Sequence, residues 1–350
     1  MFDSSLARAH QGPRTLPGPS GRRWQLAHPA CFGAALLMLG GLGLLSLLIG
    51  SSGASWRALV SDDPDLASQA RIVLLESRLP RTLSLVLAGS ALGVAGLIMQ
   101  ALARNRFTEP STAGTTESAG LGMLAATLLA PGLPVVGKML VSTVFALVGT
   151  LLFLQILRHI RLQSILIVPL IGIMLGSVID SVNSFLAYRF DLLQSLGAWS
   201  NGDFSAVLEG RYELLWIGLA LTVAAYLLAA RLTVAGMGEA FSRNLGLHYH
   251  RVMALGLGMV AMITAIVVST VGMVPFLGLI VPNLVSAVLG DNARRTMPWV
   301  AVTGAVFVLA CDVIGRTIRY PYEIPAGTVA GVLGCALFLF LLLRSGARHG

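Results

Sequence analysis

The chain has 350 residues, of which 55% are hydrophobic and only 11% are charged, and its mean hydropathy is +0.80. Water-soluble domains carry about 25% charged residues, so this composition excludes a soluble domain and predicts an integral membrane protein. The formal net charge of +8 is interpreted as a signal of membrane topology, and no nucleic-acid partner is expected.

The two ends of the chain are predicted to be tails on the cytoplasmic side. Residues 1–29 hold scattered proline and glycine, which is typical of disorder, and residues 345–350 form a short C-terminal tail. The apolar run that starts at residue 30 is longer than the core of a secretory signal and has no clean cleavage site after it. Residues 30–344 are therefore predicted to form one transmembrane domain.

Windows of membrane length predict an all-α polytopic protein with about ten transmembrane helices, of which the third and eighth are the weakest. The predicted spans are 30–50, 82–102, 112–131, 135–157, 164–187, 212–231, 252–272, 276–290, 297–317 and 325–343.

Orientation follows from the loops. The segments 51–77 and 188–211 are too polar to cross a bilayer and are expected to lie in water. With both termini on one side, that side collects 15 of the 24 basic residues. Cytoplasmic loops carry an excess of Lys and Arg, so both termini are predicted to be cytoplasmic.

The second span shows the clearest boundaries. Thr82–Leu102 is apolar throughout and would be about 31 Å long as a helix, the thickness of a bilayer core. Arg78 and Arg81 precede it and are interpreted as lying at an external helix start, where the helix dipole disfavours cations. Few acidic neighbours besides Glu76 are expected for them. Small residues within the span favour close packing against another helix, namely Gly89, Gly93 and Gly96.

The sequence offers no catalytic constellation. Gly132–Lys138 fits half of a phosphate-binding loop, but Met139 replaces the required hydroxyl residue and no strand precedes the segment. All six histidines lie in tails or predicted cytoplasmic loops, and no Cys/His pair has metal-ligand spacing. The chain is therefore predicted to be no enzyme and to hold no metal or cofactor, and any ATP hydrolysis is expected on another chain.

Intramembrane polar residues are few. Asp180 and Asn183 share a helix face and would either line a polar cavity or hydrogen-bond inside the bundle, and both readings stay open. Asp312 and Arg316 stand four residues apart, which favours an ion pair on one helix face. An ion-coupled carrier acting alone is the rival interpretation, but such a protein should show more buried charge.

Five motifs in order carry a family resemblance. They are Arg78–Arg81 (RLPR), Arg104–Pro110 (RNRFTEP), Gly238–Gly246 (GEAFSRNLG), Phe276–Pro282 (FLGLIVP) and Glu323–Gly327 (EIPAG). Together they resemble the permease family of bacterial ABC importers for iron-siderophore complexes, haem and cobalamin. The resemblance implies a location in the bacterial cytoplasmic (inner) membrane. The implied partners are a second permease subunit, identical or paralogous, a pair of cytoplasmic ATP-binding subunits and an extracytoplasmic substrate-binding protein.

The resemblance also implies roles for particular residues. Arginines on the outer face of such permeases receive acidic residues of the binding protein, and the matching positions here are Arg78, Arg81 and Arg316. A cytoplasmic coupling helix docks on the ATPase, and its matching positions are Gly238, Glu239, Arg243, Leu245 and Gly246. The stretch Arg161–Ser164 matches the inner gate region, so Gln163 and Ser164 are expected at the gate. Asp180 and Asn183 are added to the candidate translocation path because of their shared helix face.

The stretch Ser111–Gly122 departs from the commonest family pattern and is similar to the subgroup that serves catecholate-type siderophores. Ile318–Glu323 is also similar to that subgroup. The resemblance therefore implies import of an iron-siderophore complex by alternating access, with cobalamin or haem as the alternative substrate.

Overall fold

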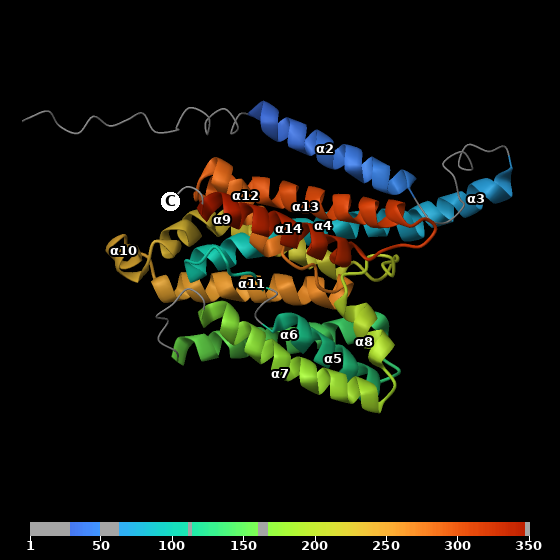
Figure 1. The fold of residues 1–350 in the computed structure, drawn as a ribbon, viewed down its shortest axis with the longest axis horizontal. Coiled ribbons are helices and arrows are strands. Elements are labelled where there is room, and N and C mark those ends of the chain that lie inside the picture. The colour runs from blue at the N-terminus through green and yellow to red at the C-terminus, as the bar shows by residue number, and fades with distance from the viewer. Residues whose placement is uncertain (1–28, 50–62, 111–113, 160–166, 347–350) are drawn as a thin grey trace, which may run out of the picture.

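The computed structural model describes residues 29–49, 63–110, 114–159 and 167–346, and within these ranges the chain contains helices, turns and loops only. The helices (Figure 1) are α2 (Pro29–Leu48), α3 (Pro64–Val73), the π-helical turn η2 (Leu74–Arg78), α4 (Leu79–Ala103), α5 (Thr115–Leu129), α6 (Val135–His159), α7 (Ile167–Arg189), α8 (Leu193–Ser200), α9 (Leu214–Gly236), α10 (Glu239–Asn244), α11 (Tyr249–Val271), α12 (Leu277–Leu289), α13 (Ala293–Ile318) and α14 (Ala326–Gly346).

Each predicted span overlaps one helix of this set. Seven helical stretches of the described residues are long and apolar enough to cross a membrane. The two spans predicted to be weakest correspond to α5 and α12, which have only 15 and 13 residues. The predicted N-terminal tail lies almost wholly outside the described residues. The all-helical, multi-span architecture is thus confirmed.

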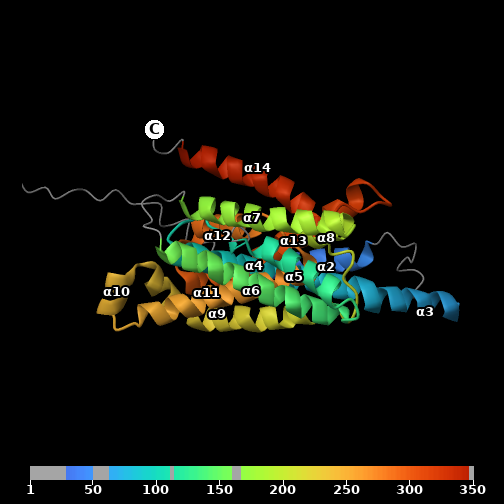
Figure 2. The same ribbon diagram turned by 90° about the horizontal axis from the view of Figure 1, so that it is seen from below.

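The predicted helix start beside Arg78 and Arg81 is wrong. One uninterrupted helix runs from Pro64 to Ala103, through α3, η2 and α4, so the helix begins 18 residues before Thr82. Its N-terminus is well specified, since Pro64 occupies the first turn and the Asp63 carboxylate accepts a 3.0 Å hydrogen bond from the backbone N–H of Asp65. Polarity here indicates a helix that projects beyond the bundle, as α3 does in Figures 1 and 2.

Helix α4 is the central helix. It packs against α13, α9, α11 and α12, and most of its residues are buried. The glycines on it make close backbone approaches possible: a Cβ at Gly89 would lie 2.7 Å from the carbonyl oxygen of Gly304 on α13. A Cβ at Gly93 would lie 3.2 Å from the Val300 carbonyl oxygen. The predicted packing role of these glycines is confirmed.

Helix α12 contains a proline, Pro282, which leaves a backbone carbonyl without its usual helical partner. A side chain of α4 bonds to that carbonyl instead. Pro282 has no N–H, so it cannot bond to the carbonyl of Gly278 four residues earlier. The Gln100 side chain on α4 donates to that carbonyl at 3.1 Å and to the Leu279 carbonyl at 3.2 Å. The amide of Gln100 therefore satisfies a buried acceptor that α12 leaves open.

Candidate docking and coupling sites

The predicted site residues separate into two groups at opposite ends of the bundle. Figures 1 and 2 show α3 projecting at one end and α10 at the other. Arg78, Arg81 and Arg316 lie toward the end that carries α3, which is called the α3 end below. The coupling residues lie at the α10 end.

Arg81 on α4 holds two acidic residues. Its Nε and Nη2 donate to Oδ1 of Asp312 on α13, at 3.1 and 2.7 Å, and its Nη1 donates to Oε2 of Glu323 at 2.7 Å. The Arg81 side chain is only 12% exposed. The expectation that Arg81 has few acidic neighbours is therefore wrong, because its partners lie 231 and 242 positions away in the sequence.

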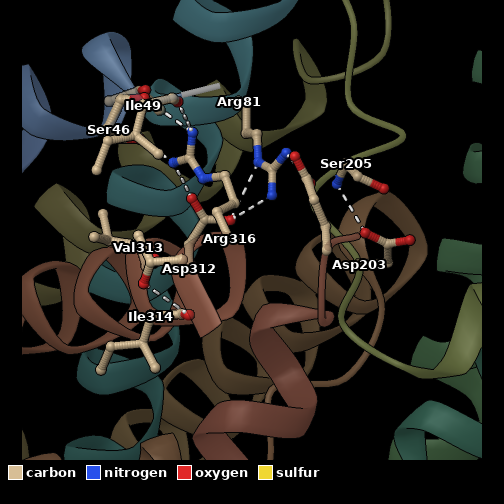
Figure 3. A network of polar contacts seen from close by, with 12 residues as sticks. Ser46, Ile49, Arg81, Asp203, Ser205, Asp312, Val313, Ile314 and Arg316 are labelled. Atoms are coloured by element: carbon tan, nitrogen blue, oxygen red, sulfur yellow. Dashed lines mark hydrogen bonds and ion pairs between the residues drawn. The ribbon is translucent and has the colours of Figure 1, made fainter. Parts of the chain in front are cut away.

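Arg316 completes this network (Figure 3). It pairs with Oδ2 of Asp312, one turn earlier on α13, as the four-residue spacing predicted. Its Nη1 also donates to the carbonyls of Ser46 and Ile49, at 2.9 and 2.7 Å, and its Nη2 to the Ser46 hydroxyl at 2.5 Å. We call Arg81, Asp312, Arg316 and Glu323 the four-charge cluster.

Two of the three candidate docking arginines cap the same helix end. Arg78 donates through Nη1 to the carbonyl of Leu47 at 3.0 Å, and Arg316 reaches the carbonyls of Ser46 and Ile49. The last carbonyls of a helix lack intrahelical partners and carry the negative end of its dipole. Arg78 and Arg316 thus attach the C-terminus of α2 to α4 and α13. Sequence reasoning missed Ser46, although it is the one hydroxyl residue of α2.

Helix α10 is short and mostly solvent-exposed. Glu239 and Arg243 form an ion pair at 2.6 Å along the helix. Phe241 on the helix and Leu245, which follows its last residue, are apolar and are 48% and 58% exposed. Ser242 faces inward and donates to the Val234 carbonyl at 3.0 Å, which fixes α10 against the end of α9. The predicted short helix is confirmed, and it presents apolar side chains outward.

Glycine is required on both sides of α10. Gly238 has φ 115° and Gly246 has φ 76°, backbone conformations that other residues rarely adopt. A Cβ at Gly238 would also lie 2.7 Å from Nη2 of Arg104, the left-handed cap residue that ends α4. The Gly238 backbone therefore lies directly against Arg104, the first residue of the RNRFTEP motif after the central helix. Motifs separated by more than 130 residues meet here.

The structure describes two of the four candidate pathway residues, Asp180 and Asn183, and their surroundings differ. Gln163 and Ser164 lie outside the described residues. Asp180 is exposed on α7, whereas Asn183 is buried and donates to the Glu117 carbonyl on α5 at 2.7 Å. Asn183 thus takes the bundle-interior hydrogen bond that the sequence left open.

Two cavities of about 350 and 290 Å³ lie in the bundle, and neither is lined by Asp180 or Asn183. One of about 350 Å³ runs between α5, α6, α8 and the end of α11, with Lys138, Asp203 and Arg211 among its lining residues. Another of about 290 Å³ lies beside α10, lined in part by Gln100 and Arg104. The signal that sequence reasoning overlooked is the series of hydroxyl residues within apolar helices around the first cavity, such as Thr116 and Ser142.

Within the described residues no group of three or more His, Cys, Asp and Glu side chains is arranged to hold a metal ion. The α3 end offers a charge-balanced polar cluster, and the α10 end offers a small apolar protrusion. Both suit contact with another protein.

This architecture defines a polytopic helical membrane protein, and the comparisons identify its family. The chain matches the FecCD transport family over residues 34–344 and belongs to that family. It is 49% identical over 280 residues to the petrobactin import system permease of Bacillus subtilis, which covers 80% of this chain and 89% of the relative. It is 39% identical over 299 residues to the ferric-anguibactin transport system permease of Vibrio anguillarum, covering 85% and 94% of the two chains.

A more distant relative and a solved structure also match the chain. The vitamin B12 import system permease of Klebsiella pneumoniae is 32% identical over 358 residues, covering 99% of this chain and 100% of the relative. A solved structure of a metal-chelate type ABC transporter in an inward-facing conformation superposes with a TM-score of 0.78. It covers 91% of this chain and 100% of its own, at 23% identity, so it supports the fold.

Proposed function

We propose that this chain is the permease subunit of an ABC importer that moves a ferric siderophore of the petrobactin and anguibactin kind into the cytoplasm. The observation that carries the proposal is the 49% identity to a petrobactin import permease over 80% of the chain. Identity to vitamin B12 permeases is lower, at 32% over nearly the whole chain. An iron-siderophore substrate is therefore favoured over cobalamin or haem.

The proposed assembly places this chain in the bacterial cytoplasmic membrane with a second permease subunit, identical or paralogous. Ten helices cross the bilayer, including the short α5 and α12, and both termini are cytoplasmic. A pair of ATP-binding subunits hydrolyses ATP and contacts α10, and an extracytoplasmic binding protein delivers the substrate to the α3 end. The path between them, which includes the gate region near Gln163, opens to one side at a time. This subunit catalyses no reaction.

Uptake of radiolabelled ferric petrobactin tests the substrate. Cells that lack their own petrobactin permease should regain uptake when this chain and its partner subunits are expressed. Uptake of vitamin B12 and haem in parallel cells should not change. Vanadate, which blocks ABC ATPases, should abolish petrobactin uptake, whereas uptake that survives vanadate and collapses with an ionophore would support the ion-coupled carrier instead.

The contact between α10 and the ATPase rests on the exposed side chains of Phe241 and Leu245. Changing both to Ala should lower capture of the ATP-binding subunit by about tenfold, because apolar side chains at the centre of an interface carry much of the binding free energy. Leu255→Ala is the matched control, since Leu255 is similarly exposed, at 56%, but belongs to α11 and not to the α10 segment. Capture that is unchanged in the double variant would contradict the assignment.

A further inference from the structure

The four-charge cluster is electrically neutral as it stands. Arg81 and Arg316 contribute two positive charges, and Asp312 and Glu323 contribute two negative ones, joined by three ion pairs in a row from Glu323 through Arg81 and Asp312 to Arg316. An acidic side chain that approached this cluster from outside would therefore add a third carboxylate to two guanidinium groups. Such an addition leaves an uncompensated negative charge in a partly desolvated place, which is unfavourable.

We propose that Glu323 is an exchangeable carboxylate, which an acidic side chain of the external binding protein displaces from Arg81 on docking. The inference rests on the proposed function, which supplies that partner. Exchange of one carboxylate for another keeps the cluster neutral and leaves the hydrogen bonds of Arg81 satisfied. Glu323 would return to water while the binding protein is seated.

The two acids of the cluster differ in how readily they can leave. Asp312 lies within α13, is 1% exposed and accepts hydrogen bonds from both arginines. Glu323 lies in the segment between α13 and α14, is 19% exposed and is bonded to Arg81 through one oxygen. Only Glu323 has both a path to water and a single guanidinium bond to break.

The surroundings of Glu323 also suit a protein contact. Tyr320 and Tyr322 in the same segment are 65% and 71% exposed, and Ile318 is 65% exposed. Arg319 lies over the Tyr322 ring, 5.8 Å from its centroid. Tyrosine and arginine are enriched in protein interfaces. A partner seated on these side chains would bring its own acid close to Arg81.

The test measures how tightly the permease complex binds its cognate substrate-binding protein. Full complexes in lipid nanodiscs are titrated with that protein, loaded with ferric petrobactin. Glu323→Gln should lower the Kd about fivefold, because no carboxylate has to leave, while the amide oxygen still accepts from Nη1 of Arg81. Glu323→Ala, which removes the internal acceptor altogether, should also bind more tightly than the unaltered chain.

Glu209→Gln is the matched control. Glu209 is exposed at the same end, where its backbone N–H donates to the Glu76 carbonyl at 3.0 Å, and it is not part of the cluster. Its removal changes the overall charge equally, so a Kd within about twofold of the unaltered chain is expected. An equal gain from Glu209→Gln would overturn the exchange and indicate a general field effect.

Two other results would also overturn the proposal. Unchanged or weaker binding of both Glu323 variants would show that Glu323 does not compete with the partner. Absence of binding even to the unaltered complex would overturn the proposed function, and the exchange with it. The first result leaves the importer assignment intact, so the two failures are distinguishable.

Discussion

At the scale of single residues, Asp312 is the group on which the α3 end depends. Its two oxygens face Arg81 on α4 and Arg316 on α13, and the side chain is almost completely buried. Without this carboxylate, two guanidinium groups would face each other with only Glu323 to balance them. Changing Arg81 to Glu would have the opposite effect, because the new carboxylate would join those of Asp312 and Glu323 with only Arg316 to balance them. Lost uptake in that variant would therefore report misfolding rather than lost docking.

Replacing Asp312 with Asn should lower the free energy of unfolding by about 3–5 kcal/mol, the usual result of breaking a buried ion pair. Denaturant unfolding of the purified permease in detergent measures this. The matched control is Asp291→Asn, because Asp291 pairs with Arg106 at 2.8 Å on the surface, where both side chains are well exposed. That variant should lose about 1 kcal/mol at most. Similar losses in the two variants would contradict the role given to Asp312.

The sequence identified the charged residues at the α3 end, but it did not predict which of them form ion pairs with one another. The pairing of Asp312 with Arg316 was predictable, since four residues form one helical turn. The pairing of Arg81 with Asp312 depends on how α4 and α13 pack, and that is not a local property. The helix-dipole argument for Arg78 and Arg81 failed because the helix continues back to Pro64.

At the scale of elements, the junction of α4 and α12 shows how glycine and proline act together. Pro282 frees the Gly278 carbonyl, Gln100 donates to it, and Gly96 allows the two backbones to come close enough for that bond. A Cβ at Gly96 would overlap the Gly278 carbonyl group. The close approach and the hydrogen bond therefore depend on each other.

Gly96→Ala should destabilise the protein by about 1–3 kcal/mol, because α4 and α12 have to move apart and the Gln100 bond is stretched. Gly258→Ala on α11 is expected to stabilise the protein, because a Cβ there meets nothing within 4 Å. Alanine in a helix interior is favoured over glycine by about 0.5–1 kcal/mol. Melting temperatures of both variants in the same detergent check the prediction, and a gain in both would show that Gly96 is not a contact residue.

Hydropathy located the elements well because a bilayer sets their length and composition. Every predicted span has its helix, and the weak third and eighth spans are the short helices α5 and α12. Helices α3 and α8 were overlooked, since at 10 and 8 residues they are too short to show as membrane spans. Helix α10 was predicted from its charged, helix-forming residues and its closing glycine.

At the scale of the whole molecule, α4 connects the two candidate contact sites. Arg81 near its start belongs to the four-charge cluster, and Arg104 at its end lies against Gly238 beside α10. Helix α4 is also the most buried of the spanning helices. A displacement at either end would be carried along one rigid, tightly packed element. Under the proposed function, α4 would be the physical route by which docking at one end and ATPase contact at the other influence each other.

The orientation of the molecule is the last prediction. If 15 of 24 basic residues face the cytoplasm, the α10 end is inside and the α3 end outside. Single cysteines at Asn201, beside α8, and at His250, beside α10, lie on opposite sides under this topology, and both positions are exposed. The background chain has Cys31, Cys311 and Cys335 replaced by Ala. A membrane-impermeant maleimide added to intact spheroplasts should label Asn201→Cys and leave His250→Cys unlabelled until the membrane is permeabilised.

The cysteine-free chain must stay unlabelled under both conditions, which shows that the signal comes from the introduced residue. Equal labelling of the two variants in intact spheroplasts would mean leaky cells, and a permeant reagent on the same sample detects this. Labelling of His250→Cys alone would show that the orientation is the reverse of the predicted one. The α3 end would then face the cytoplasm, and neither the docking of an external binding protein there nor the contact of α10 with an ATPase could stand.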